Sequence, residues 1–424
     1  MRLTREQRQI LNGSKGEVMA KVMKTLVMYG HTFGADRLVP VSSEYNHLLT
    51  SFGLKMMTPI FELMEKLAEA GALSTQAFSV NPRPMDKAVP ANLLQRLVFK
   101  YLMYSEQENY EKRLTELGLL NDKAYTCTCY LDQVGNLPQR GEILSWAEPS
   151  AVSYANSVLG ARCNRNSGMM DLMGAVAGFV PRFGLLTDEG RMANWIVKVR
   201  TTEQPEAQLL GAAIAMRVKE EVPYIAGMKR WLGTELTEAV RSYLKDFGAA
   251  ADSSVALYHV EELTPEAKDF GADLIKENCK VYVIDDKELE RVRRSYPVLW
   301  RRKNRKPNLC FVGCPHLSMQ QLKQWTLRLE CGLQEERRKR VRIPTVFTAA
   351  PAVIEEFSRT EYAKRLKDTG VILSYVCPLM YMNNPLCGSL RVITNSNKLR
   401  GYSTARYYPE EELLDMLTKG EIEE

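Results

Sequence analysis

Strand-like segments alternate with helical segments from Lys280 onward, and this alternation constrains the fold more than any other feature. The predicted strands are VYVID, LCFVGC, PTVFTA and VILSYVC, and segments with helical periodicity separate them. Strands that alternate with helices are typical of parallel βαβ units. The sequence therefore predicts an α/β protein whose C-terminal part contains a mostly parallel sheet.

One stretch of this region, Leu309–Gln321, is predicted to deliver a cysteine to the mouth of a crevice. The apolar segment LCFV reads as a buried strand, and Gly313 is expected to end it. Because SMQQ has the spacing of a capping box, a helix should begin directly afterwards. Cys314 and His316 then lie in a strand-to-helix turn. Ligands of open α/β sheets bind outside the carboxyl ends of such strands.

The composition limits the classes of protein to which this chain can belong. The chain has 424 residues, of which 45% are hydrophobic, enough for two or three lobes with their own cores. We expect lobes at 1–120, 121–275 and 276–424. The charged start and the lack of long apolar runs predict a cytoplasmic protein without a signal peptide or membrane span. Nine cysteines without regular spacing do not resemble a disulfide framework.

Basic residues cluster at 291–306 and 337–342 in a chain with a formal charge of +6. Solvated loops and helix faces are the simplest interpretation, and an acidic substrate or a nucleic acid is the alternative. Because few aromatic residues are interleaved with these clusters, nucleic-acid binding is not favoured.

The N-terminal region has the pattern of a βαβ unit followed by a long helical segment. Strands are predicted at 37–41 and 72–80, with a helix between them. Ser43 and Asn81 follow these strands, where turn formation and ligand contact are both open. Residues 91–117 are predicted to be helical. Their expected buried stripe consists of Leu93, Leu94, Leu97, Val98 and Tyr101.

A segment rich in small and polar residues runs from Ala124 to Gly168 and contains a predicted helix. Small residues allow close backbone approach, and arginine offers a planar fork for carboxylate or phosphate. An internal salt-bridged network and a substrate site both remain open. GARCNRNSG matches neither a P-loop nor GxGxxG, so nucleotide binding has little support. The polar residues concerned are Glu148, Asn156, Ser157, Arg162, Asn164 and Arg165.

Three of the cysteines stand apart from the others. A lone cysteine usually behaves as a small buried hydrophobe, and we assign Cys163, Cys279, Cys310, Cys331 and Cys387 to that class. Cys127, Cys314 and Cys377 instead lie at strand ends or in polar turns. Three thiolates from distant segments suit an iron-sulfur cluster, and an iron left without a fourth protein ligand can act as a Lewis acid.

Several ordered motifs resemble the large-subunit or catalytic domain of the aconitase X family, an iron-sulfur hydro-lyase group in the aconitase superfamily. They are GADRLVPV, TCT at 126–128, WAEPSAVSYANSVLGARCNRNSG, YHVEELTPEA, VGCPHLS and TNSNK. The resemblance implies an aconitase-like fold of several α/β lobes with mostly parallel sheets around a central cluster site. It also implies a 4Fe-4S or 2Fe-2S cluster held by Cys127, Cys314 and Cys377.

The same resemblance implies a set of polar residues around the substrate. Glu148 and His316 are its catalytic candidates. This chain departs from the family pattern at Cys129, where CTPY becomes CTCY, and at Cys163, Pro149 and near Tyr45. Cys129 could therefore compete as a ligand. The implied substrate-binding residues are Ser43, Asn81, Asn156, Ser157, Arg162, Asn164, Arg165, Ser396 and Lys398.

Family members carry a small swivelling domain that supplies the catalytic base, and the sequence leaves no evident room for it. The resemblance therefore implies a separate small subunit and a small-molecule hydroxy acid as substrate. We favour cis-3-hydroxy-L-proline or a related compound, with mevalonate 5-phosphate as the alternative. A non-catalytic binding or regulatory member is the second kind of function that the altered positions allow.

Overall fold

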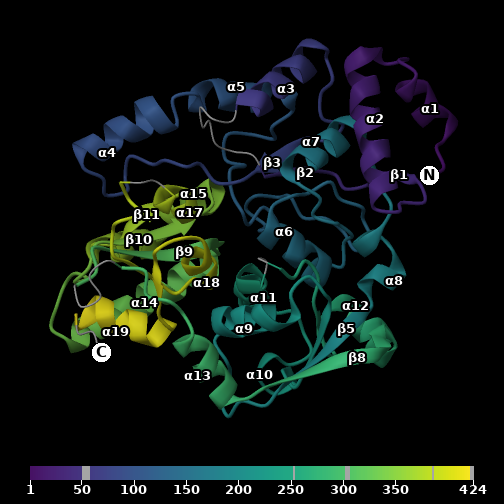
Figure 1. The fold of residues 1–424 in the computed structure, drawn as a ribbon. Helices are drawn as coiled ribbons and strands as arrows, with labels where there is room; N and C mark the ends of the chain where they lie inside the picture. Colours follow the sequence, from purple (N-terminus) through teal and green to yellow (C-terminus); the bar gives the residue numbers. More distant parts are fainter. Residues whose placement is uncertain (50–57, 252–253, 301–305, 384–385, 421–424) are drawn as a thin grey trace.

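The computed structural model describes residues 1–49, 58–251, 254–300, 306–383 and 386–420. Two parallel sheets with flanking helices make up the central and C-terminal parts, and helices with short strands make up the N-terminal part (Figure 1). This arrangement confirms the predicted α/β fold class with mostly parallel sheets flanked by helices. The division into lobes at 1–120, 121–275 and 276–424 stays a prediction.

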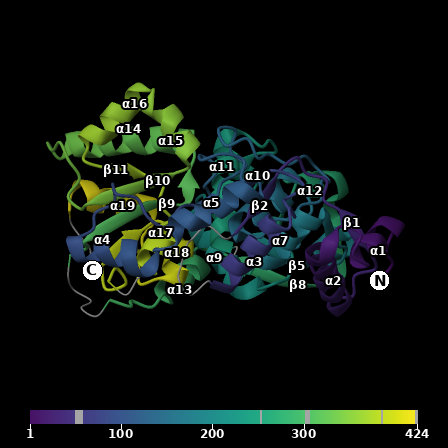
Figure 2. The ribbon, with the colours of Figure 1, turned by 90° about the horizontal axis from the view of Figure 1, so that it is seen from above.

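The C-terminal sheet has the strand order β11-β10-β9-β12-β13, and all of its pairings are parallel. β9 and β10 are almost wholly buried, as expected of parallel strands covered on both faces. Figure 2 shows α14, α15 and α16 on one side of this sheet and α17 and α18 on the other. The strands are β9 (Leu309–Leu317), β10 (Thr345–Ala349), β11 (Ile372–Ser374), β12 (Val392–Thr394) and β13 (Arg406–Tyr407). The helices are α14 (Met319–Glu335), α15 (Pro351–Ser358), α16 (Glu361–Asp368), α17 (Pro378–Met382), α18 (Asn397–Tyr402) and α19 (Glu410–Thr418).

The central sheet has the parallel order β7-β6-β5-β8. β8 contains the VYVID segment, so the first strand of the predicted C-terminal alternation pairs with β5 and not with β9. Which sheet a strand joins depends on long-range pairing that periodicity does not encode. The strands are β5 (Ala193–Val199), β6 (Pro223–Ala226), β7 (His259–Val260) and β8 (Ile275–Ile284). The helices are α8 (Asp188–Arg191), α9 (Ala207–Val218), α10 (Lys229–Leu232), α11 (Glu238–Ala251), α12 (Pro265–Phe270) and α13 (Asp286–Arg294), with short 3₁₀ turns at Gly184–Leu186 and Gly271–Leu274.

The predicted N-terminal βαβ unit is wrong in its pairing. β1 pairs antiparallel with β4, whereas β3 pairs in parallel with β2, a strand that the sequence did not predict. β2 is buried and immediately follows a bend, so its few residues carry no alternation. The strands are β1 (Leu38–Pro40), β2 (Asn46–Leu48), β3 (Phe78–Val80) and β4 (Phe179–Pro181). The helices are α1 (Arg5–Leu11), α2 (Gly16–Thr32), α3 (Thr58–Glu69), α5 (Gln107–Leu117), α6 (Pro149–Tyr154) and α7 (Gly168–Ala177).

Residues 91–117 are helical as predicted, but the apolar stripe there is not buried. The segment consists of α4 (Leu93–Val98), a π-helix η2 (Phe99–Met103) and α5. Leu93 is 73% exposed, and Leu94 and Tyr101 are each 61% exposed. Phe99 and Tyr104 supply the contact with the C-terminal lobe, against Tyr381 and Met382. The exposed leucines of α4 therefore lie outside that contact.

In the part of the chain that the structure describes, no helix combines the length and apolar character needed to cross a bilayer.

Candidate active site

Three segments that are distant in the sequence carry the predicted ligand cysteines. Cys127 lies in the loop after Tyr125, whose backbone bridges to Val80 at the end of β3. Cys377 is the N-cap residue of α17, and its amide donates to the Arg83 carbonyl at 2.8 Å. All nine cysteines are free thiols in the structure.

Cys314 lies within β9, not after it, which corrects the predicted strand-to-helix turn. β9 continues to Leu317, but its pairing with β10 shifts register between Val312 and Leu317. Gly313 allows this bulge with φ of 108°, and a Cβ there would lie 2.4 Å from the Thr348 carbonyl oxygen. A bulge re-aims the side chains of a strand. It therefore turns Cys314 out of the ladder, and the predicted capping box of α14 follows directly.

His316 ties the three cysteine-bearing segments together. Its backbone amide donates to the Cys127 sulfur at 3.4 Å, and its Nδ1 lies 3.0 Å from the Thr126 hydroxyl. Its Nε2 lies 3.4 Å from the carbonyl oxygen of Val376, the residue before Cys377. Burial lowers the pKa of His316 to about 4, so the ring is neutral at physiological pH. The buried ring fixes the spacing of the three segments through hydrogen bonds to two of them.

Electrostatic interactions between the cysteine side chains contribute to their pKa values. Burial, with smaller contributions from the Glu148 and Cys314 side chains, raises the pKa of Cys127 to about 12, although Lys398 and the His316 amide act to lower it. Burial also raises the pKa of Cys377 to about 12, with a contribution from Cys127. Thiols in this environment stay protonated unless a cation stabilises the thiolate.

A buried ion pair lies beside Cys127. The Lys398 ammonium donates to Glu148 at 2.9 Å and to the Ser150 hydroxyl at 3.3 Å. Glu148 caps α6 and accepts from the Ala151 amide at 2.6 Å. Burial acts to raise the pKa of Glu148, but Lys398, Ser150 and the Ala151 amide hold it below the ordinary value. The structure therefore keeps an ionised carboxylate next to a lysine in a region almost closed to solvent.

The start of α18 meets the Cys314 bulge. The Ser396 hydroxyl donates to the Cys314 carbonyl at 2.5 Å and also caps α18. Gln208 reaches the same carbonyl at 3.5 Å, and its own carboxamide oxygen accepts from the Asn397 amide at 2.8 Å. These contacts bring Ser396 and Lys398 to the cysteine-bearing segments, as the predicted site requires.

Ser43 and Asn81 present buried polar atoms that bind nothing in the described residues. The Ser43 hydroxyl and the Asn81 carboxamide oxygen are closed to solvent and have no hydrogen-bond partner there. Buried polar groups in proteins are nearly always paired, and an unpaired one needs an explanation such as a ligand or an ordered water. These two atoms are therefore suited to a ligand, and their role as substrate contacts stays a prediction.

The polar residues after α6, where the π-helix η3 (Ala155–Leu159) begins, make internal contacts. Asn156 bonds both backbone groups of Cys163 at 2.9 Å, and Ser157 accepts from the Tyr258 amide at 2.9 Å. Asn164 bonds the Phe183 carbonyl at 3.0 Å. These bonds run to Cys163 and to residues in 183–191 and 254–258, and not to the segments that carry Cys127, Cys314 and Cys377. Their geometry is that of a supporting network.

The two arginines of this segment contact an exposed carboxylate and a backbone carbonyl. Arg162 pairs at 2.5 Å with Asp188, a carboxylate that is 87% exposed, and an anionic ligand could replace so exposed a partner. Arg165 has φ of 54° and reaches the Ser254 carbonyl at 3.2 Å. Substrate binding by Asn156, Ser157, Arg162, Asn164 and Arg165 stays a prediction.

Sequence reasoning missed three supporting residues. Thr126 bonds His316, Ser150 bonds Glu148 at 2.7 Å, and Lys245 donates to the His316 carbonyl at 3.2 Å. In the sequence, Thr126 could be recognised only as part of the TCT motif. Lys245 lies mid-helix in α11 without a distinguishing pattern, because its partner is 71 positions away.

Comparison with known proteins agrees with the fold and identifies the family. Sequence models of the first, second and third domains of aconitase X match residues 1–189, 193–294 and 307–415. A crystal structure of Thermococcus kodakaraensis aconitase X in its holo-form superposes with a TM-score of 0.79 at 28% identity, covering 98% of this chain and all of that chain. Fold and matches together define an aconitase-type hydro-lyase. The chain belongs to the aconitase X family, as its motifs indicated.

The relatives divide into two named groups. This chain is 32% identical over 415 residues to the phosphomevalonate dehydratase large subunit of Thermococcus kodakarensis, covering 95% of both chains. It is 26% identical to the cis-3-hydroxy-L-proline dehydratase of Pseudomonas aeruginosa, covering 95% of this chain but 66% of that one. Both names are those of dehydratases, which are hydro-lyases, so the predicted enzyme class is confirmed.

Proposed function

We propose that this chain is the large subunit of an iron-sulfur dehydratase that removes water from phosphomevalonate. The observation that carries the proposal is the convergence of Cys127, Cys314 and Cys377 around His316, beside the buried pair of Glu148 and Lys398. The sequence alone favoured cis-3-hydroxy-L-proline. The phosphomevalonate dehydratase large subunit of Thermococcus kodakarensis matches at higher identity than the hydroxyproline dehydratase, 32% against 26%, and over 95% of its own length against 66%, so we now prefer that alternative.

The donor set fits a cluster better than a single ion. Among the described residues, no three His, Cys, Asp or Glu side chains gather closely enough to hold one metal ion. A cluster distributes its cysteines over different irons, so they are spaced more widely. When bound, a cluster with one iron lacking a protein ligand would supply Lewis-acid assistance to a leaving hydroxyl. Cys129 is buried in the core near Ser79, which supports Cys127 as the ligand of this loop.

The chain's own residues would bind and orient the substrate. Glu148 can accept a proton or hydrogen bond, and Lys398 can donate one, because Lys398 helps to hold the pKa of Glu148 below its ordinary value and the two groups are in direct contact. Arg162 and Arg165 offer guanidinium forks for a carboxylate or phosphate. His316 is neutral and fully engaged by hydrogen bonds, which supports a positioning role for it.

A small subunit would complete the site. Two relatives at 32% identity are named large subunits, which supports a partner of that kind. The matched part covers only 66% and 65% of the two hydroxyproline dehydratases, which leaves room for a further domain in those proteins. We expect the base that removes the proton to come from the partner.

The exposed face of α4 and η2 is a suitable docking surface for that subunit. Its leucines and Tyr101 form an apolar face that a monomer does not usually leave in water. The same segment packs on α17 through Phe99, whose ring lies 5.8 Å from Tyr381, so the face lies near Cys377. Leu94→Glu should weaken association with the small subunit, whereas Met216→Glu, at an apolar position exposed to a similar degree, should not. Equal affinity of the wild-type, Leu94→Glu and Met216→Glu proteins for the small subunit in calorimetric titration would contradict this placement.

Anaerobic purification with the co-expressed small subunit tests the function. Iron, sulfide and visible absorbance should fall sharply in Cys314→Ser and stay unchanged in Cys331→Ser, which alters an exposed thiol. An unchanged spectrum in Cys314→Ser would contradict the cluster assignment. The loaded pair should dehydrate phosphomevalonate in preference to cis-3-hydroxy-L-proline. A retained cluster without turnover of any hydroxy acid would favour the non-catalytic alternative.

A further inference from the structure

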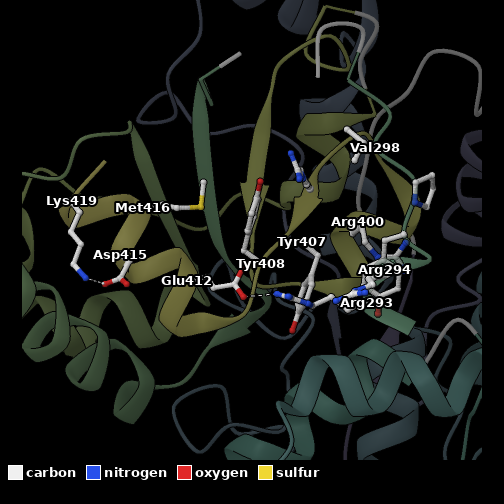
Figure 3. A pocket seen from close by; sticks show the side chains of 13 residues that line it. Arg293, Arg294, Val298, Arg400, Tyr407, Tyr408, Glu412, Asp415, Met416 and Lys419 are labelled. Carbon is white, nitrogen blue, oxygen red and sulfur yellow. Dashed lines mark hydrogen bonds and ion pairs between the residues drawn. The ribbon is translucent and has the colours of Figure 1, made fainter. Parts of the chain in front are cut away.

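A polar cavity separate from the candidate active site lies among α13, α18, β13 and α19, with a volume of about 560 Å³. This size is typical of pockets for small molecules. Figure 3 shows arginine and tyrosine side chains around it, with ion pairs joining Glu412 to Arg293 and Asp415 to Lys419. None of the cysteines and none of the predicted substrate contacts line it.

Two arginines of this cavity lack a carboxylate partner in the described residues. Arg293 and Arg294 pair with glutamates, but Arg400 bonds only the Asn397 carboxamide, at 2.8 Å. Arg406 has no hydrogen bond or ion pair from its guanidinium within the described part of the chain. Both are partly buried, and burial lowers the pKa of Arg400. Partly buried cations without counter-charges favour the binding of an anion.

Aromatic rings complete the lining. The Arg400 guanidinium lies 3.8 Å from the centre of the Tyr296 ring, and Arg406 lies 5.2 Å from that of Tyr408. Stacking of this kind holds the guanidinium plane while its edge stays free to donate. The cavity thus offers planar cationic donors and aromatic surface.

The cavity and the candidate active site lie on opposite faces of one helix. Lys398 and Arg400 are two positions apart in α18, which separates them by about 200° around the axis. Lys398 points to Glu148 in the active site, whereas Arg400 lies over Tyr296 in the cavity. A ligand in the cavity would therefore not occupy the position of the substrate.

We propose that this cavity is a second binding site, specific for a phosphate-bearing small molecule, with Arg400 and Arg406 as its principal ligands. Phosphate matches the guanidinium fork in shape and charge, and the volume leaves room for an organic group against the tyrosines. The site does not depend on the proposed dehydratase activity, since it shares no residue with that machinery.

Pyrophosphate is the probe for the test, titrated calorimetrically into the full chain with its small subunit. Arg400→Gln and Arg406→Gln should each weaken binding by about tenfold or more, the loss expected for one charge-assisted contact. Arg359→Gln, which removes an equal charge at an exposed position paired with Glu355, should leave binding unchanged. Cys314→Ser should also leave it unchanged, which separates this site from a phosphate subsite around the cluster.

Two results would overturn the proposal. The first is equal affinity of wild-type, Arg400→Gln and Arg406→Gln proteins for pyrophosphate. The second is loss of binding in Cys314→Ser or Arg162→Gln with retention in both cavity variants, because pyrophosphate would then bind at the active site alone. Circular dichroism and melting temperatures matching wild type establish that the cavity variants are folded.

Discussion

Lys398 and Glu148 lie 250 positions apart in the chain, and the lysine Nζ donates to the glutamate carboxylate at 2.9 Å. The lysine side chain is 10% exposed and the glutamate 3%. The pair joins the N-cap of α6 to α18, a helix that flanks the C-terminal sheet. It therefore fixes both the charge state of the candidate site and the contact between two parts of the molecule.

Removing only the lysine should be strongly destabilising. Lys398→Met leaves the Glu148 carboxylate buried without its counter-ion, which typically costs about 3–5 kcal/mol. The melting temperature should fall clearly, as measured by scanning calorimetry. Lys364→Met, which removes an exposed lysine paired with Asp368, should leave it almost unchanged. The double variant Glu148→Gln/Lys398→Met should recover part of the loss, and no recovery would show that lost packing, not the stranded charge, is responsible.

Gly313→Ala should disturb the bulge that presents Cys314. The added Cβ would meet the Thr348 carbonyl oxygen at 2.4 Å, and φ of 108° is unfavourable for alanine. Together these effects should cost about 2–4 kcal/mol. Gly13→Ala is the matched control, since its φ is 95° and nothing lies within 4 Å of the new Cβ. If both variants lose equal stability in denaturant titration, the close contact with β10 is not what requires glycine.

The sequence predicted the features that depend on local pattern. The β9–α14 unit and its capping box follow from short segments and their motifs, whereas the joint ligand role of Cys127, Cys314 and Cys377 was implied by the family resemblance and stays a prediction. It did not predict which way the apolar stripe of α4 faces, because periodicity identifies a face but not the surface that covers it. Nor could it give the partner of β8 or the contact of Lys245 with His316, because both depend on tertiary packing.

His316→Ala should loosen the junction of the cysteine-bearing segments. The substitution leaves the Val376 carbonyl without the ring that meets it, and a buried group so stranded costs about 1–3 kcal/mol; the Thr126 hydroxyl keeps only its contacts with Thr128. We expect a lower melting temperature and a lower iron content after anaerobic purification. His31→Ala, at an exposed position of α2, should change neither. Normal iron content in His316→Ala would contradict the positioning role assigned to this ring.

Glu206 should make the stability of the chain depend on pH. Burial, aided by the nearby Glu410 carboxylate, raises the pKa of Glu206 from 4.5 to about 7 in the folded protein. The folded state therefore holds this proton more tightly than the unfolded state, and stability falls as pH rises from about 4.5 to 7. Glu206→Gln keeps an acceptor for the Glu410 amide but has no proton to lose.

The variant should accordingly gain stability relative to wild type across this window, by up to about 3 kcal/mol at pH 8. The measurement is the difference in melting temperature between the two proteins at several pH values from 4 to 8. Asp171, whose pKa burial also raises to about 7, is present in both proteins, so its contribution cancels in the difference. A difference that stays constant over the whole range would show that Glu206 titrates in the folded protein as it does in water.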